Sequence, residues 1–410
     1  MLTYVMSVDL AVIGSGVSGL SVAAHAIDKG MKVCIIEANP IKYNATIRSA
    51  GIATVQMEDT LDIRLAKRGI EIIEMWGRRY GLSSIKRTGL LTIDGIDELK
   101  EYSSILNECN VRNTIYTSKE VMDWGWLNTN INEAVEEAYL YTYIDISMDP
   151  LEFFPSFAKE LMNKGVIVLN GYGKVNINDN DKEASVLVKN VGSSDITHVK
   201  SNAVVLCAGA WLSKDMLTNH HDEHGSSILD AIRRNIHTYI VPLVFIRYRE
   251  ERVQIYDYNI IPFDDEITGT YWITRGKDML VGGDYTAWRI DDIRIYESTY
   301  STESITIDKE RGYIEHVTDA LSRRVRDIKL EYSKIHYGPI NITSDSRPVV
   351  GAIPYFKNLY ILDGLRGYGL ARAPALAEML VNSIVDNNNN KYIISDINVS
   401  RFLQNKSVNK

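Results

Sequence analysis

Residues 10–37 read LAVIGSGVSGLSVAAHAIDKGMKVCIIE. An apolar strand leads into Gly14, Gly16 and Gly19, and an apolar helix follows. A second apolar strand ends at Glu37, about 18 residues after Gly19. A strand, a glycine-rich turn, a helix and a strand ending in an acid form the βαβ fingerprint of a dinucleotide-binding fold.

Each part of this stretch has a physical task. Gly14 permits a tight turn, Gly16 lets the backbone approach a pyrophosphate, and Gly19 lets the helix pack closely on the strand. The first N–H groups of the helix direct a partial positive charge at the phosphates. Glu37 accepts hydrogen bonds from ribose hydroxyls. The stretch therefore predicts a bound dinucleotide.

The composition is that of an ordinary globular protein. The chain has 410 residues, enough for two or three domains, and a formal net charge of −8, which argues against a nucleic-acid-binding surface. We interpret Cys34, Cys109 and Cys207 as buried small side chains of a cytoplasmic protein, because they are too widely spaced for a disulfide framework. We expect no signal peptide and no transmembrane segment.

Downstream patterns predict further elements. Asp149 and Pro150 begin an expected helix that Gly165 ends, and residues 166–169 and 203–206 are typical of buried strands. Residues 238–283 hold short runs rich in Tyr, Ile and Val, which favour an antiparallel sheet. Residues 313–328 indicate an amphipathic helix with a solvated face that includes three arginines: Arg323, Arg324 and Arg326.

Rossmann-like material returns near the end of the sequence. Residues 358–363 (NLYILD) are typical of a strand, residues 364–369 of a glycine-rich turn, and residues 371–385 of an apolar helix. These elements lie hundreds of residues after the first fingerprint. The nucleotide-binding domain is therefore predicted to be discontinuous, with the β-rich region inserted.

Five segments in chain order carry a family resemblance: residues 14–19 with Glu37, residues 46–51 (TIRSAG), Asp149-Pro150, residues 204–211 (VVLCAGAW), and residues 345–351 (DSRPVVG) followed by 364–369 (GLRGYG). The chain resembles the FAD-dependent oxidoreductases of the D-amino-acid oxidase superfamily, which includes glycine oxidase, sarcosine oxidase and related dehydrogenases. A nicotinamide enzyme has no obvious use for the second and last glycine-containing segments, so the pattern favours FAD over NAD.

The resemblance implies an α/β fold: a discontinuous Rossmann-like FAD-binding domain (1–85, 145–215 and 335–390) and an inserted antiparallel-sheet (α+β) substrate domain (86–144 and 216–334). Residues 391–410 would form a C-terminal tail. We expect non-covalent FAD, because no cysteine or histidine matches a linking position convincingly. The implied FAD-binding residues are Gly14, Ser15, Gly16, Val17, Ser18, Gly19, Glu37, Ala38, Arg48, Ser49, Ala50, Gly51, Val175, Ala208, Gly209, Trp211, Gly338, Arg347, Gly364, Gly367, Tyr368 and Gly369.

The resemblance further implies hydride removal from a carbon bearing an amine or hydroxyl, onto flavin N5. Many family members grip the substrate carboxylate with an arginine, but Ile340 occupies that position here. The replacement candidates are Arg48, Arg247, Arg275 and Arg366, and the candidate pocket tyrosines are Tyr256, Tyr258, Tyr271 and Tyr368. Of these we select Arg366, Tyr368 and Arg275 as the catalytic-site residues.

Three functions remain open at this stage. The first is oxidation of a small amine or amino acid. The second is oxidation of a 2-hydroxy acid or glycerol 3-phosphate. The third is a flavin-binding subunit of a hetero-oligomeric electron-transfer dehydrogenase, whose acceptor would be a protein or a quinone. The histidines in NHHDEHG, namely His220, His221 and His224, are interpreted as a surface helix end or loop, so no metal site is predicted.

Overall fold

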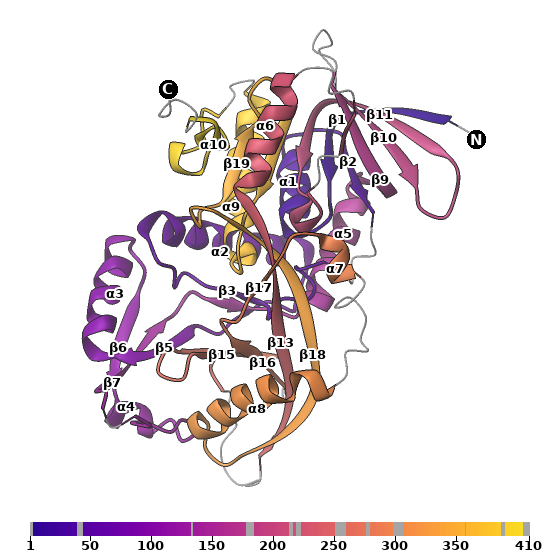
Figure 1. Ribbon diagram of the computed structural model, residues 1–410. Coiled ribbons are helices and arrows are strands. Elements are labelled where there is room, and N and C mark those ends of the chain that lie inside the picture. The colour runs from indigo at the N-terminus through magenta and orange to yellow at the C-terminus, as the bar shows by residue number, and fades with distance from the viewer. Residues whose placement is uncertain are drawn as a thin grey trace.

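The computed structural model describes residues 3–38, 44–132, 134–177, 184–212, 216–218, 223–250, 260–275, 279–297, 307–356, 358–386 and 390–404. Figure 1 shows two parts, each built on a sheet. The long strands β13 and β18 run from the upper part into the lower one.

The first sheet has a parallel core in the order β9–β2–β1–β11–β20. Val12 lies beside Ile35 on one side and beside Val205 on the other, so the fingerprint strand is central. Strand β10 pairs antiparallel with both β9 and β11. Strand β19 pairs antiparallel with β20 and forms one edge of the sheet. The strands are β1 (Thr3–Ile13), β2 (Val33–Glu37), β9 (Ile167–Ile177), β10 (Ala184–Asn190), β11 (Ile196–Leu206), β12 (Leu217–Thr218), β19 (Val349–Ala352) and β20 (Leu359–Asp363).

Helices cover both faces of the first sheet. On one face α1, α2, α5 and α9 share a core with the sheet, and on the other α6 contributes Ile228, Leu229 and Ile232. Helix α5 begins at the predicted Asp149 N-cap, whose side chain accepts a hydrogen bond from the Leu151 N–H. The bounds are α1 (Val17–Asp28), α2 (Thr60–Tyr80), α5 (Pro150–Asn163), α6 (Glu223–Arg234), α9 (Gly369–Val385) and α10 (Arg401–Gln404), with 3-10 turns η2 (Gly209–Trp211) and η5 (Ser395–Ile397).

The second sheet is mostly antiparallel, as the sequence predicted. Its path is β17–β13–β16–β15–β14–β5–β7–β6, and β18 pairs with β13 along the length of both strands. The strands are β5 (Leu90–Gly95), β6 (Asn113–Thr117), β7 (Glu137–Thr142), β13 (Ile236–Glu250), β14 (Phe263–Asp265), β15 (Thr270–Arg275), β16 (Met279–Asp284), β17 (Trp288–Ile290) and β18 (Ile328–Thr343).

Small elements connect the two sheets. Strands β3 (Ile52–Ala53), β4 (Lys86–Arg87) and β8 (Ile146–Ser147) form a short sheet of their own. Helices α3 (Ile96–Glu108) and α4 (Ser118–Met122) flank β6 and β7, and α7 (Ile293–Ile295) follows β17.

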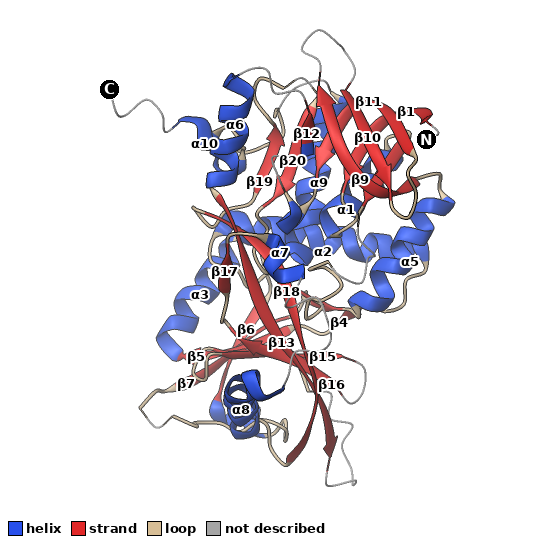
Figure 2. Cartoon of the chain, turned by 45° about the vertical axis from the view of Figure 1, so that its right-hand side comes forward, coloured by secondary structure: helices blue, strands red, loops and turns tan. Residues whose placement is uncertain are grey.

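The two faces of the second sheet have different neighbours. Its inner face carries Leu243, Phe245, Ile273 and Val281, which pack with Ala50 from the first part of the molecule. Its outer face is covered by α8 (Ile307–Arg324), which Figures 1 and 2 place on the side away from the first sheet.

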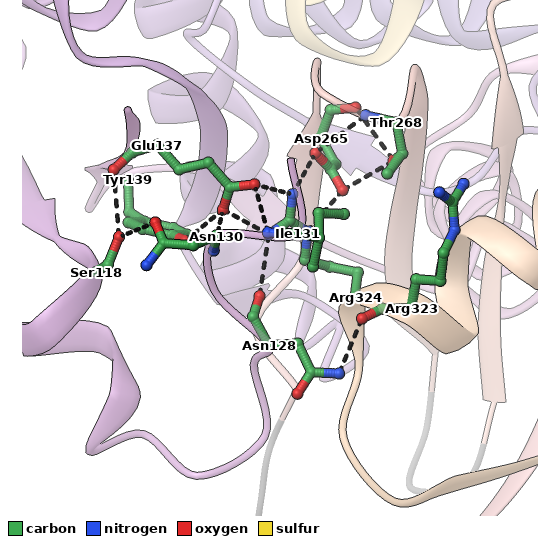
Figure 3. A network of polar contacts seen from close by, with 10 residues as sticks. All are labelled: Ser118, Asn128, Asn130, Ile131, Glu137, Tyr139, Asp265, Thr268, Arg323 and Arg324. Atoms are coloured by element: carbon green, nitrogen blue, oxygen red, sulfur yellow. Dashed lines mark hydrogen bonds and ion pairs between the residues drawn. The ribbon is translucent and has the colours of Figure 1, made fainter. Parts of the chain in front are cut away.

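The predicted solvated face of α8 is wrong at one position. Arg324 is fully buried, and its guanidinium binds Glu137 of β7 at 2.9 Å and Asp265 of β14 at 2.7 Å (Figure 3). Burial raises the pKa of Glu137, but hydrogen bonds from Arg324 and Tyr139 outweigh it and hold that pKa below its ordinary value. Arg324 therefore ties α8 to the sheet, while Arg323 remains exposed.

Two boundary segments lie with the first sheet. Strand β12 pairs with β9, and α6 packs in the core of that sheet, although residues 216–234 fall in the predicted substrate domain. The segment predicted as a tail is packed up to residue 404, because Ile397 and Val399 are buried.

The three cysteines are free and buried, as the sequence predicted. Among the described residues, no helix combines the length and the apolar character needed to cross a bilayer.

Candidate active site

The glycines of the fingerprint are required by close contacts. Gly14 has φ +105°, and a Cβ there would lie 2.4 Å from the Cys207 carbonyl oxygen. A Cβ on Gly19 would lie 1.9 Å from the Gly14 carbonyl oxygen. A larger residue at either position would therefore separate α1 from β1 and β11, which matches the predicted roles of these glycines.

The N-terminus of α1 offers its N–H groups to an anion. Gly16 is the N-cap and has no side chain to accept hydrogen bonds, and the first turn holds no acidic residue. The Val17 N–H donates to Thr46 Oγ1 at 2.9 Å, which fixes the segment at residues 46–51 beside the helix end. At the end of β2, Glu37 Oε2 accepts hydrogen bonds from the Ser15 N–H and hydroxyl, both at 2.7 Å.

A second helix N-terminus lies at the same place. Gly369 is the first residue of α9, and a Cβ there would lie 3.4 Å from Val17 Cγ1 of α1. Cβ atoms built on Gly209 and Gly367 meet no heavy atom within 4 Å. The N-termini of α1 and α9 carry partial positive charge and lie beside glycines whose backbone is free of side-chain contacts. This arrangement fits the diphosphate and the electron-accepting ring of FAD.

The turn at residues 46–51 joins this region to the second sheet. The Ser49 hydroxyl donates to the Thr46 carbonyl at 2.8 Å. Gly51 has φ +89°, and a Cβ there would lie 2.2 Å from the Met148 carbonyl oxygen. The predicted turn and the predicted Asp149 helix start are therefore adjacent and must pack without a side chain at position 51.

One of the predicted arginines reaches this turn, and another lies in it. Arg275 at the end of β15 donates from Nη2 to the carbonyls of Ser49 at 2.8 Å and Ala50 at 3.1 Å. Its Nε is buried and has no partner among the described residues. Burial lowers the pKa of Arg275, and only the charge of Asp149 opposes this. Arg48 donates from Nη1 to the Tyr337 carbonyl at 3.0 Å.

The C-terminal glycine loop is held by pairs that sequence reasoning missed. Arg372 in α9 is fully buried, bonds Asp62 of α2 at 2.7 Å and donates to the Leu365 carbonyl at 2.6 Å. The signal was an arginine inside the otherwise apolar residues 370–377 (LARAPALA). Arg366, predicted as a site residue, pairs with Glu58 at 3.0 Å, so its guanidinium already has a carboxylate partner.

An acidic residue on the inner face was also missed. Asp264 of β14 lies opposite Tyr271 of β15 and accepts a hydrogen bond from the Tyr285 hydroxyl. Burial raises the pKa of Asp264 to about 7; the hydrogen bond from Tyr285 opposes this, and the charge of Glu266 adds to it. The charge of Asp264 in turn helps burial to raise the pKa of Tyr368 in the glycine loop. No spacing pattern singled out this aspartate.

The remaining predicted positions are scattered around the site. Trp211 donates from Nε1 to Glu297 at 2.7 Å, and Arg347 pairs with Asp396 at 2.7 Å and with Asp59 at 3.4 Å. Val175 is a buried residue of β9, Ala38 and Ala208 follow β2 and β11, and a Cβ on Gly338 would approach Arg48 only at 3.8 Å.

Some candidates lie elsewhere. Arg247 is exposed on β13. Tyr256, Tyr258, His220 and His221 lie outside the described residues, and His224 falls in α6. Within the described ranges, no group of His, Cys, Asp and Glu has the arrangement of a metal site.

The fold and the fit of its glycine cradle to FAD define a flavoprotein oxidoreductase. A model of the FAD dependent oxidoreductase (DAO) family matches residues 9–383. The chain therefore belongs to this family of FAD-dependent oxidoreductases.

Individual relatives are distant but similar over nearly the full length. L-proline dehydrogenase from P. horikoshii is 22% identical with a TM-score of 0.73, covering 98% of this chain and 99% of that one. Glycine oxidase from Geobacillus kaustophilus is 17% identical with a TM-score of 0.73, covering 96% and 99%. FAD-dependent oxidoreductase domain-containing protein 1 of Xenopus laevis is 22% identical, covering 96% of this chain and 82% of that protein.

Proposed function

We propose that this protein oxidises a small amino acid at the carbon that bears its amine. Bound FAD supplies the acceptor for the hydride, at flavin N5. Similarity to proteins named L-proline dehydrogenase and glycine oxidase supports this substrate class. The residues of this chain would bind the carboxylate, position the amine and hold the flavin loop.

The observation that carries the proposal is the state of Arg275. Its guanidinium donates only to the carbonyls of Ser49 and Ala50, and its buried Nε has no partner among the described residues. A buried cation without a carboxylate is costly, so such a group is normally paired. A substrate carboxylate would supply the missing partner, which compensates for Ile340 at the usual arginine position.

The cofactor contacts proposed for this chain are the glycine cradle of α1, Glu37, the turn at residues 46–51, and the loop at residues 364–369. We propose that FAD is held without a covalent bond. Burial raises the pKa of the Cys34 thiol to about 12, and burial likewise raises the pKa of Cys207, so neither is a ready nucleophile. Acid precipitation should release all of the flavin into the supernatant.

An anaerobic absorbance titration of the purified flavoprotein tests the function. Amino acids of both configurations, N-methyl amino acids, 2-hydroxy acids and glycerol 3-phosphate are added in turn. We expect bleaching of the flavin by an amino acid. Bleaching only by hydroxy acids, or by no donor at all, contradicts the proposal, and the second outcome favours a subunit that needs a partner.

A matched pair of variants isolates the carboxylate contact. Arg275→Met should strongly slow bleaching, while Arg275→Lys keeps part of the native rate. Arg112→Met is the control, because Arg112 also lies over an aromatic ring, that of Tyr143 at 4.5 Å, but is exposed. Unchanged bleaching in Arg275→Met would remove Arg275 from the site.

A further inference from the structure

The inner face of the second sheet carries a group of cations around one aromatic ring. Phe245 lies opposite Lys334 in the β13–β18 register, and Leu243 lies opposite His336. Directly opposite residues of antiparallel strands point to the same face. Lys334 and His336 therefore share the inner face with Phe245.

The distances confirm the grouping. The Arg275 guanidinium lies 5.2 Å and the Lys334 ammonium 5.1 Å from the Phe245 ring centroid. The His336 ring lies 4.7 Å from the same ring, centroid to centroid. Arg275 and Lys334 thus cannot be further apart than the sum of their two distances from Phe245, and a short molecule with two charges spans such a gap.

The described residues supply little negative charge at this place. Among the described residues, Arg275 donates hydrogen bonds to carbonyls alone, and the Lys334 ammonium lies over the Phe245 ring without an ion pair. Burial, followed by the charges of Lys334, Arg48 and Arg275, lowers the pKa of His336 to about 4. No carboxylate of the described residues contributes to that shift, so the field that these residues create is positive.

One carboxylate neutralises only one of the two permanent cations. The half-buried Arg275 reaches the turn at Ser49 and Ala50, whereas the Lys334 side chain is exposed to solvent. An anion that contacts both must therefore extend from the turn toward solvent. Lys334 also has a flexible stem, so its ammonium follows a second charge over a range of positions.

The opposite end of the inner face would repel a second negative charge. There Asp264 lies with Glu266 and Asp94, whose charges add to the burial that raises the pKa of Asp264. A substrate with a second carboxylate is thus directed away from Asp264 and toward Lys334. The distribution of charge on the inner face, acidic near Asp264 and cationic near Lys334, therefore sets the direction in which the substrate side chain points.

We propose that the substrate is a dicarboxylic amino acid, whose first carboxylate binds Arg275 and whose second carboxylate binds Lys334 beside His336. This inference rests on the proposed amino-acid oxidation and names its substrate class. It assigns Lys334 as a specificity residue, because its charge distinguishes a dicarboxylate from the matching amide.

Three pairs of compounds test the assignment on the protein with its FAD: aspartate and asparagine, glutamate and glutamine, and iminodiacetate and N-methylglycine. Each chiral amino acid is used in both configurations. We expect kcat/KM at least tenfold higher for the dicarboxylate of the pair that reacts. Lys334→Gln should remove most of that preference by lowering kcat/KM for the dicarboxylate.

The matched control is Lys164→Gln. Lys164 is also exposed and lies 5.8 Å from an aromatic ring, that of Tyr80, but at the end of α5. Equal rates for dicarboxylate and amide, with no effect of Lys334→Gln, would overturn the inference and leave amino-acid oxidation intact.

A binding measurement separates the two proposals. Succinate and its monoamide cannot lose hydride from an amine-bearing carbon, and their affinity is read from the shift of the flavin absorbance. Tighter binding of succinate that Lys334→Gln reduces about tenfold supports the paired-anion site even if no amino acid bleaches the flavin. Equal affinities in the native protein and in Lys334→Gln overturn it.

Discussion

Arg324 and Arg275 are two cations on opposite faces of the second sheet. Arg324, the last residue of α8, is fully buried against the outer face, and Arg275 of β15 is half-buried on the inner face. On the outer face, the Arg324 guanidinium makes five hydrogen bonds to Glu137, Asp265 and the Asn128 carbonyl. On the inner face, Arg275 bonds two carbonyls and leaves its Nε unpartnered among the described residues. A cation that serves stability has its charge balanced by carboxylates of the same chain. A cation that serves binding leaves part of its capacity for a ligand.

The largest expected effect is on stability, at Arg324. Arg324→Met leaves the carboxylates of Glu137 and Asp265 buried without their cation, and we expect it to lower the free energy of unfolding by about 3–5 kcal/mol. Chemical denaturation followed by circular dichroism measures this. Arg311→Met, which removes an exposed pair with Glu315 on the same helix, should leave the midpoint nearly unchanged. A small effect at Arg324 would erase the difference between the two faces.

The same substitution at Arg275 should affect function instead. We expect Arg275→Met to unfold at a midpoint close to that of the native protein and to retain FAD, because no buried carboxylate loses its partner. Its kcat/KM for a carboxylate-bearing donor should fall by about 100-fold, since hydrogen bonds to charged groups contribute about 1.5–3 kcal/mol. Strong destabilisation with normal kinetics would show that Arg275 is structural.

A rescue experiment sharpens the comparison. Adding Glu137→Gln and Asp265→Asn to Arg324→Met removes the two orphaned charges, so about 1–2 kcal/mol of the lost stability should return. Denaturation of the single and triple variants under identical conditions measures the difference. If the triple variant is less stable than the single variant, the unpaired charges are not what destabilises it.

The smallest expected effect concerns Asp264. Its carboxyl has a pKa of about 7 in the folded protein and an ordinary value of 3.8, so between these pH values the folded state holds the extra proton. The free energy of unfolding therefore falls as the pH rises through this window. Asp264→Asn should remove that fall, matching the native protein near pH 4 and melting about 1–3 °C higher at pH 8. A pH-independent difference in melting temperature would contradict the assignment.

The sequence predicted the first sheet well because its determinants are local. The glycines at positions 14 and 19, the Asp149 cap and the strand at residues 358–363 each depend on neighbours a few residues away or on backbone contacts with them. The order of these segments then indicated the family. Arg275 was also named from its sequence position, as one of several candidates.

Side-chain partners were harder to predict because they come from distant strands. The helical pattern of residues 313–328 predicted the apolar stripe of α8. The sequence around Arg324 did not indicate that Glu137 and Asp265 of the sheet would be its partners. Arg372 was hidden in the same way, since Asp62 lies in another helix. Asp264 and Lys334 became candidates for the site only because the strand register places both on the inner face.

The order of strands in the first sheet has a consequence for how the protein folds. Ile13 lies beside Leu206, and Leu206 beside Ile361, so the central strands come from the beginning, middle and end of the chain. Such distant pairings close large loops, which slows folding and delays it during synthesis. The glycine turn at residues 14–19 is synthesised early, but β20 and α9, which complete its surroundings, are synthesised last. Until then the emerging chain exposes the edge of β11, so we expect this protein to depend on chaperones more than a protein of equal size with local contacts.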